Sequence, residues 1–495
     1  MSNIVIIGGG VSGLSAGIYA QLAGHHGIVC EGHFIAGGNL TGWDRGGYHI
    51  DNCIHWLTGT NPVTPTYKMW KELGALGDVE IMYPESLYTC ELDGKTLSMY
   101  CDLDKIEKEM LEISPEDKRE TRSFIKAVRT FQGALGIGGK CHNEKDNIFT
   151  TILGAPTIIK YYSLTTKELS QRFKHPLLKA FIVGFWGDNF GSLALIMVMA
   201  HFCANNGGIP RGSSRGMAER MTKKFTDLGG ELLLKKEVVK INHQNGKAHS
   251  VTFADGSSID ADYVVITSDP AESFKRLMDI PMPKSLEKKY NNSRLYRFSG
   301  YHCAFACDLA DLPFKGDLIF EIPEKYRRIL NTNHLILREF SHEKDFAPEG
   351  KNILQTLTFC YEKDALEFIR LREEDKEAYK AKKEMISQIL KELIEDKLPE
   401  LRGKLEVIDF WTPATYRRFV RSEIGSFMSF ALPSKSLPLR TSNKVDGFSN
   451  VFLATQWQQT PGGLPIAAEG GRLAIEAIKK ADAKIDYIIT VGGGF

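Results

Sequence analysis

The sequence predicts an α/β protein in which a parallel-stranded unit is assembled from distant segments of the chain. A short apolar run at 4–7 is followed by glycines and a helical pattern. Residues 250–267, "SVTFADGSSIDADYVVIT", indicate a hairpin turned by Asp255-Gly256 and then another buried strand. Residues 454–471 place a second glycine turn before an Ala-rich helix. Because 495 residues exceed one ordinary domain, we expect a second unit between these segments.

The N-terminal strand leads into a glycine motif. Gly8, Gly10 and Gly13 match G-x-G-x-x-G, and Glu31 ends the next predicted strand about 20 residues further on. In this motif the glycines allow a tight turn, close approach of a pyrophosphate and close helix packing, while the helix N-terminus attracts phosphate. Glu31 would accept hydrogen bonds from ribose hydroxyls and repel a 2′-phosphate. The pattern predicts a Rossmann-type site for FAD or NAD(H).

The stretch after Glu31 distinguishes these two cofactors. An NAD-binding domain normally continues with another helix and strand. Here residues 32–60 are rich in glycine, with Gly37-Gly38 soon after the acid. We expect this loop to return toward the cofactor, which favours FAD.

Segments along the whole chain resemble the phytoene desaturase, carotenoid isomerase and retinol saturase group of the amine-oxidase-like flavoproteins. Besides the N-terminal motif, the resemblance is carried by "AGGNLTGW" with "GGYHIDNCIHWLTG", by "GGIPRGSSRGMAERM" and by "TPATYRRFVRSEIGS". The C-terminal "QWQQTPGGLP" is most similar to the retinol saturase and isomerase branch. Together these segments are far more specific than any one motif.

The resemblance also implies roles for residues far from the first motif. Gln456 would lie near the pyrophosphate or ribityl chain, and the backbone of Gly463-Leu464 near the pyrimidine edge of the flavin. The backbone of Val238 would contact the adenine. Asn39 stands where many relatives carry Arg or Lys, so no charge-assisted phosphate contact is expected there. The predicted cofactor-binding residues are Gly8, Gly10, Gly13, Glu31, Gly37, Gly38, Asn39, Val238, Gln456, Gly463 and Leu464.

The predicted organisation is a discontinuous Rossmann-type FAD-binding domain with an inserted α+β substrate domain. The FAD-binding segments are 1–70, 207–275 and 445–485; the substrate domain takes 71–206 and 276–444. Four alternating segments indicate an antiparallel sheet in the substrate domain: 301–309, 316–322, 334–343 and 353–362. A charged helix at 373–401 follows, with an expected apolar face of Met385, Ile386, Ile389, Leu390 and Leu393.

Residues 147–206 form a mostly helical, apolar block in this prediction. It forms a helical core layer, or it lines a long hydrophobic tunnel or touches a membrane from which a lipid enters, and the sequence is compatible with both roles together. The longest apolar stretch, at 190–204, is shorter than the ~20 residues that span a bilayer. The N-terminus lacks the features of a signal peptide. We therefore expect a cytoplasmic protein, either free or peripherally membrane-associated.

Composition excludes other classes of function. The net charge of +1 offers no field for holding nucleic acid. Neither a metal-ligand spacing nor a Ser-His-Asp order is present, so no metal is expected and the flavin would carry the reaction. His55 is the candidate for handling a proton near the flavin ring, and a structural role for it is equally compatible with the sequence.

Three functions are compatible with these features. The leading one is an FAD-dependent oxidoreductase that desaturates, saturates or isomerises carbon–carbon double bonds of a carotenoid, retinoid or unsaturated lipid. The second is an FAD-dependent amine oxidase. The third is a non-catalytic protein of the same fold that binds or escorts a lipid, against which the intact glycine motif and Glu31 argue. The sequence leaves open the substrate, the reaction direction, the electron partner and the oligomeric state.

Overall fold

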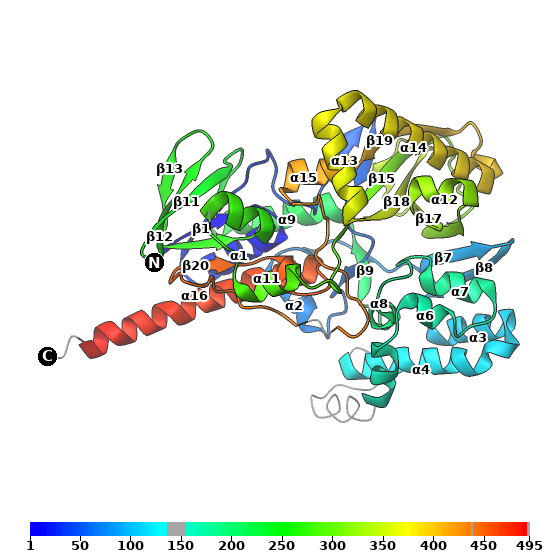
Figure 1. Cartoon of the computed structure of the whole chain (residues 1–495), viewed down its shortest axis with the longest axis horizontal. Coiled ribbons are helices and arrows are strands. Elements are labelled where there is room, and N and C mark those ends of the chain that lie inside the picture. The colour runs from blue at the N-terminus through cyan, green and yellow to red at the C-terminus, as the bar shows by residue number, and fades with distance from the viewer. Residues whose placement is uncertain (136–154, 279, 437–438, 493–495) are drawn as a thin grey trace.

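A computed structural model of the chain describes residues 1–135, 155–278, 280–436 and 439–492 (Figure 1). Its main features are a five-stranded sheet and a seven-stranded sheet. In Figure 1 the five-stranded sheet lies on the left. The seven-stranded sheet lies on the upper right beneath α13 and α14, and a group of helices lies below it.

The five-stranded sheet is parallel throughout and has the order β10-β2-β1-β14-β20. Alternate residues of its central strand face opposite sides, as pleated strands require. Ile4 and Ile6 pack with the helices, whereas Val5 and Ile7 pack against a small antiparallel sheet. Burial on both faces explains the continuous apolar run. The strands are β1 (Asn3–Ile7), β2 (His26–Cys30), β10 (Glu231–Leu233), β14 (Tyr263–Ile266) and β20 (Val451–Leu453).

The small antiparallel sheet consists of β11 (Val238–Gln244), β12 (Lys247–Phe253) and β13 (Ser258–Asp260). β12 and β13 form the hairpin predicted around Asp255-Gly256, and Gly256 adopts φ +84° in its turn. Such a conformation costs glycine little. The hairpin and the following buried strand are therefore confirmed.

Helices from opposite ends of the chain pack together on the other face of the parallel sheet. These are α1 (Val11–Leu22) and α16 (Leu464–Gly492), with α9 (Ser213–Asp227) beside α1. The hydroxyl of Ser15 in α1 donates a hydrogen bond to the carbonyl of Ala468 in α16 at 2.6 Å. This crossing joins the beginning and the end of the chain.

The seven-stranded sheet has the order β19-β15-β18-β17-β16-β7-β8. All four predicted strand segments are present in it, and every pair is antiparallel except β7 with β16, which is parallel. The strands are β7 (Ser86–Leu92), β8 (Lys95–Tyr100), β15 (Phe298–Cys307), β16 (Asp317–Glu321), β17 (His334–Glu339), β18 (Asn352–Tyr361) and β19 (Leu405–Trp411).

Three helices pack on one face of this sheet: α12 (Glu324–Leu330), α13 (Glu362–Glu374) and α14 (Lys376–Lys397). Four of the five residues predicted for the apolar face of α14 are buried. Met385 is the exception at 47% exposure, so its assignment to that face is wrong.

A helical group packs around its own core next to β7 and β8. It consists of α3 (Leu103–Ile113), α4 (Lys118–Leu135), α6 (Thr166–Ser170), α7 (Pro176–Val183) and α8 (Ser192–Phe202). Residues 155–206 are mostly helical, as predicted, while 147–154 lie outside the described residues. Among the described helices, none combines the length and apolar character needed to cross a membrane.

Short elements connect these parts. They are β3 (Gly42–Arg45), β4 (Tyr48–Asp51), β5 (Leu57–Thr58), α2 (Pro65–Glu72), β6 (Ile81–Met82), β9 (Gly207–Pro210), α10 (Pro270–Ser273), α11 (Lys284–Tyr290) and α15 (Pro413–Val420). β9 pairs with both β5 and β6.

Candidate cofactor site and adjoining aromatic cluster

The turn after β1 requires two of its glycines for its own geometry. Gly8 adopts φ +107°, and a Cβ there would lie 2.6 Å from Thr267 Oγ1. A Cβ on Gly13 would overlap the carbonyl oxygen of Gly8. Gly10 differs, because it has φ −72° and a Cβ would meet nothing closer than 3.8 Å. Nothing in the packing of the residues that the structure describes therefore excludes a side chain at Gly10.

The second glycine loop lies directly against this turn. The amide of Gly37 donates to the carbonyl of Gly9 at 2.8 Å, and Gly37 and Gly38 adopt φ +126° and +62°. A Cβ on Gly38 would lie 3.1 Å from the Cα of Gly10. The loop thus returns to the first motif.

Glu31 also lies at the glycine turn. Its Oε2 accepts a hydrogen bond from the amide of Gly9 at 2.7 Å, and its Oε1 accepts one from the amide of His33 at 2.8 Å. Burial raises the pKa of Glu31, and the backbone N–H groups oppose that rise. Each carboxylate oxygen keeps a second lone pair for a further donor.

Val238 begins β11 on the other side of Glu31. The amide of Lys236 donates to the carbonyl of Glu31 at 2.9 Å, so the two segments are in contact. The Val238 side chain is buried, and its carbonyl accepts a hydrogen bond from Arg276 at 3.2 Å.

The C-terminal turn meets the second glycine loop at a single carbonyl group. Nε2 of Gln456 donates to the carbonyl of Phe427 at 3.4 Å, and Nδ2 of Asn39 donates to the same oxygen at 3.2 Å. Oε1 of Gln456 accepts a hydrogen bond from the amide of Gly463 at 2.9 Å, one residue before α16 begins at Leu464. Phe427 was not predicted, because nothing in its sequence context marks a carbonyl that joins two distant turns.

The structure therefore brings the predicted residues of both chain ends into one region, with Val238 beside Glu31. Oδ1 of Asn39 is buried there and has no hydrogen-bond partner among the described residues. An acceptor in this state fits a ligand that carries donor groups.

His55 lies in a buried charged group that the sequence did not reveal. Its Nδ1 is 3.2 Å from Oδ2 of Asp317 in β16, and Oδ1 of Asp317 is 3.6 Å from Nε of Arg338 in β17. Arg338 also donates to the carbonyl of Ile54 at 2.5 Å. Burial lowers the pKa of His55, and the charge of Arg338 lowers it further, against an upward effect of Asp317.

A second polar group connects the glycine loop to the seven-stranded sheet. Nδ2 of Asn52 donates to the carbonyl of Asn39 at 2.9 Å, and Oδ1 of Asn52 accepts from Tyr416 and Trp411, each at 2.9 Å. The hydroxyl of Tyr416 is 3.1 Å from Nε2 of His302, whose ring stacks on Trp411 at 4.8 Å. Burial, with the charges of His55 and Arg338, lowers the pKa of His302 to about 3.

An aromatic cluster extends from His55 to Phe427. Neighbouring rings lie 5.1–5.8 Å apart between centroids along the sequence of contacts from Trp56 to Phe427. The rings come from the loop before β5, from the loop between α7 and α8, from the start of β15 and from the loop after α15. We define the aromatic cluster as Trp56, Phe185, Trp186, Phe190, Phe298 and Phe427.

The buried His302 leads to a prediction about acid stability. We expect the free energy of unfolding to fall as pH drops below 6.5, because the unfolded chain binds a proton there while folded His302 does so only near its pKa of about 3. The expected slope is about 1.4 kcal/mol per pH unit from this histidine. Urea denaturation at several pH values measures it. His302→Gln should flatten the slope by that amount, whereas His249→Gln, at an exposed position, should leave it unchanged. Equal slopes for wild type and His302→Gln would contradict the prediction.

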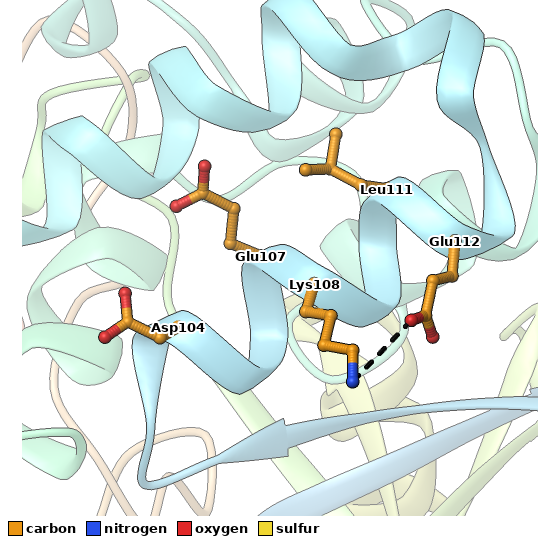
Figure 2. Close-up of a pocket in the computed structure, with 5 residues that line it drawn as sticks. All are labelled: Asp104, Glu107, Lys108, Leu111 and Glu112. Carbon is orange, nitrogen blue, oxygen red and sulfur yellow. Dashed lines mark ion pairs between the residues drawn. The ribbon is translucent and has the colours of Figure 1, made fainter.

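An open depression on the surface differs from the aromatic cluster because its lining is mostly charged. It lies on α3 and is lined by Asp104, Glu107, Lys108, Leu111 and Glu112, with Lys108 and Glu112 paired at 3.8 Å (Figure 2). Its charged lining comes from one helix on the far side of the molecule from α1 (Figure 1). Among the described residues, no group of three His, Cys, Asp or Glu side chains could hold a metal ion.

The two glycine turns, the acid after β2 and the parallel sheet define an FAD-dependent oxidoreductase. The chain belongs to the family of flavin containing amine oxidoreductases, which matches residues 11–478. This match confirms the resemblance to flavoproteins found in the sequence, the enzyme class and FAD as cofactor.

Related sequences and structures cover nearly the whole chain. The chain is 25% identical to a neurosporene-forming phytoene desaturase of Rhodobacter capsulatus, over 97% of this chain and 94% of that protein. It is 24% identical to a chloroplastic prolycopene isomerase of Daucus carota, over 86% of this chain and 71% of that protein. Its fold is similar to that of an oxidoreductase from Methanosarcina mazei, with TM-score 0.62 and 19% identity over 97% and 100% of the two chains. A putrescine oxidase with redesigned cofactor binding has TM-score 0.60 and 14% identity, over 97% and 99%. The predicted α/β fold class is confirmed.

Proposed function

We propose that the protein uses FAD to desaturate, saturate or isomerise carbon–carbon double bonds of a long apolar polyene such as a carotenoid. The observation that carries the proposal is the position of the aromatic cluster. Its last member, Phe427, offers its carbonyl to both glycine-containing turns and its ring to the cluster. A ligand on these rings would therefore adjoin the cofactor site. Aromatic faces suit a flat, apolar conjugated chain.

We infer that FAD is held by both ends of the chain. The turn with Gly8, Gly10 and Gly13 would take the pyrophosphate at the N-terminus of α1. The space at Gly10, where a Cβ would meet no protein atom closer than 3.8 Å, fits this role. When bound, the flavin supplies hydride transfer. Glu31 would bind ribose and the Val238 backbone adenine, while Gly37, Gly38, Asn39, Gln456, Gly463 and Leu464 would surround the rest of the cofactor.

The domain division is part of the same proposal. All five strands of the parallel sheet fall within 1–70, 207–275 and 445–485, the segments assigned to FAD. Residues 71–206 and 276–444 would hold the substrate, with 147–206 as its apolar helical part. We further propose that the protein is cytoplasmic and contacts a membrane peripherally to obtain its substrate. Liposome flotation with and without carotenoid tests that contact.

The relatives support carotenoids over amines. Relatives aligned along most of the chain are named for phytoene desaturation, prolycopene isomerisation and oxygenation of 4,4'-diapolycopene. The aromatic cluster is apolar; Asp317, beside His55, already faces Arg338 and His55, and Asp188, in the loop of Trp186 and Phe190, pairs with Lys167. No free anionic partner for an amine is therefore seen among these residues.

The decisive experiment is anaerobic mixing of the purified flavoprotein with phytoene or prolycopene in detergent micelles. We expect a change in flavin absorbance or, with flavin reduced beforehand, an isomerised or saturated product detected by chromatography and mass spectrometry. Amines with oxygen should give no peroxide. Peroxide from amines, together with no product from any carotenoid in either flavin redox state, would overturn the proposal in favour of an amine oxidase.

A further inference from the structure

Two charged residues of the seven-stranded sheet lie beside His55, although they are far from it in the sequence. Asp317 and Arg338 are both buried, with side chains 6% and 7% exposed. Oδ2 of Asp317 faces Nδ1 of His55 at 3.2 Å, and its Oδ1 faces Nε of Arg338 at 3.6 Å. Arg338 is fixed in turn by its hydrogen bond to the carbonyl of Ile54, the neighbour of His55. The three side chains thus form one group with defined partners.

This geometry decides which nitrogen of His55 carries the proton. An ionised carboxylate only accepts hydrogen bonds, so Nδ1 must be the donor and Nε2 keeps its lone pair. Nε2 has no hydrogen-bond partner among the residues that the structure describes, and the His55 side chain is 20% exposed. The ring makes edge contacts with Phe185 at 6.1 Å and Trp56 at 6.5 Å, both in the aromatic cluster. The lone pair on Nε2 therefore belongs to a histidine ring that borders the proposed substrate site.

We propose that Asp317 and Arg338 are positioning residues that hold the proton of the His55 ring on Nδ1, so that Nε2 is available to a hydrogen atom on a carbon of the substrate. The proposal rests on the proposed function. In the oxidative direction, oxidised FAD, when bound, would supply the acceptor for one hydrogen of the substrate together with its electron pair. The neighbouring C–H bond breaks with its proton going to Nε2, and its electron pair becomes the new double bond. In the reductive direction Nε2 returns the proton.

The charges around His55 are compatible with this role. Asp317 from β16 and Asp51 from β4 favour its protonated form, whereas burial and Arg338 from β17 favour the neutral form. The carboxylate of Asp51 is itself held by the amide and hydroxyl of Ser214, at 2.9 and 2.6 Å. His302 from β15 also faces His55 and is neutral at neutral pH, because burial lowers its pKa to about 3. His55 is therefore neutral at neutral pH and can accept a proton.

Asp317→Asn gives a sharp test because Arg338 orients the new amide. The amide oxygen should stay toward the guanidinium, which leaves the NH₂ group facing Nδ1 of His55. That donor requires Nδ1 to accept, so the proton moves to Nε2. Multiple-bond ¹H–¹⁵N spectra of ¹⁵N-histidine-labelled holoenzyme distinguish the two tautomers, and His55→Gln assigns the signal. We expect the Nδ1–H form in wild type and the Nε2–H form in Asp317→Asn.

The control is Asp117→Asn. Asp117 is a buried carboxylate in the turn just before α4, and it accepts hydrogen bonds from Ser114 and from the amides of Lys174 and His175. The substitution removes a comparable buried charge and should leave the His55 tautomer unchanged. Arg338→Lys keeps the positive charge and should keep the Nδ1–H form. This variant is the one to measure if Asp317→Asn fails to fold. Nε2–H in wild type, or the same tautomer in wild type and folded Asp317→Asn, would overturn the proposal.

Kinetics supply a second readout. Asp317→Asn should lower kcat by about 10²–10⁴-fold, the usual contribution of general acid–base catalysis, with little change in KM. The acid limb of its pH profile should shift to lower pH, because the neighbouring negative charge is lost. The tautomer spectra need no substrate, so they can fail or succeed independently of the carotenoid assignment. If no carotenoid reacts but the tautomers behave as expected, only the proposed function falls.

Discussion

Gly10→Ala is expected to give a folded protein that has lost FAD. The added Cβ meets no atom of the protein within 3.8 Å, and φ −72° suits any residue, so the turn itself tolerates alanine. If the pyrophosphate approaches this backbone as proposed, the methyl group occupies its space. We expect FAD affinity to fall at least about tenfold, which corresponds to 1.4 kcal/mol. Flavin content after purification and FAD titration by fluorescence measure the effect.

Thermal unfolding separates this effect from misfolding. FAD at about 100 times its wild-type Kd stabilises the wild-type protein by about 2.7 kcal/mol, but a variant that binds tenfold more weakly by only about 1.4 kcal/mol, so added FAD should raise the Tm of Gly10→Ala by at most about half as much as that of wild type. Without FAD the two proteins should unfold at similar temperatures. Gly13→Ala should instead unfold early even without FAD, since its Cβ overlaps the carbonyl oxygen of Gly8. Gly470→Ala in α16, where a Cβ would lie no closer than 3.4 Å to a neighbouring atom, serves as the control that keeps both stability and flavin. Full FAD binding by Gly10→Ala would refute the pyrophosphate assignment.

The sequence predicts well the features whose signals are local. The parallel strands are recognised as short apolar runs because both of their faces are buried, as for Ile4 to Ile7. The hairpin at Asp255-Gly256 is recognised because its turn needs the conformation that glycine adopts. The amphipathic pattern of α14 likewise identifies a helix before its packing is known.

The limit of such local signals is visible at Met385. A helix turns about 100° per residue, which places Met385 roughly 90° from the centre of the face formed by Ile386, Ile389, Leu390 and Leu393. Apolar character alone assigned it to that face. Whether a residue on the flank is covered depends on the width of the sheet below, which the sequence of the helix does not contain. In the structure it is 47% exposed.

The candidate site shows the same limit for contacts between distant residues. His55 and Asp317 are 262 positions apart, and Asn39 and Phe427 are 388 positions apart. Asp317 begins an ordinary strand, and the contribution of Phe427 is a backbone carbonyl, which every residue has. No residue type or spacing marks either contact. Only the folded structure, which brings His55 to β16 and the chain end to the second glycine loop, reveals them.

The same return of the chain end makes Gly471→Ala the second change with a large expected effect. A Cβ at this position in α16 would lie 2.6 Å from both the amide nitrogen of Ala16 and the carbonyl oxygen of Ser12 in α1. Both are backbone atoms, so one helix must move. Overpacking of this kind typically costs about 1–3 kcal/mol. Because the two helices begin at the two glycine turns, their displacement should also lower FAD affinity.

The adjacent Gly470 provides a matched control in the same helix. Its Cβ would meet only ordinary contacts, the nearest at 3.4 Å from Arg440. Gly470→Ala should therefore leave stability unchanged or raise it by about 0.5–1 kcal/mol, because alanine favours a helix interior over glycine. Urea denaturation with and without FAD compares the pair. If Gly471→Ala were as stable as Gly470→Ala and bound FAD equally well, α16 would not be held against α1 as described, and the joining of the two chain ends around one cofactor would have to be abandoned.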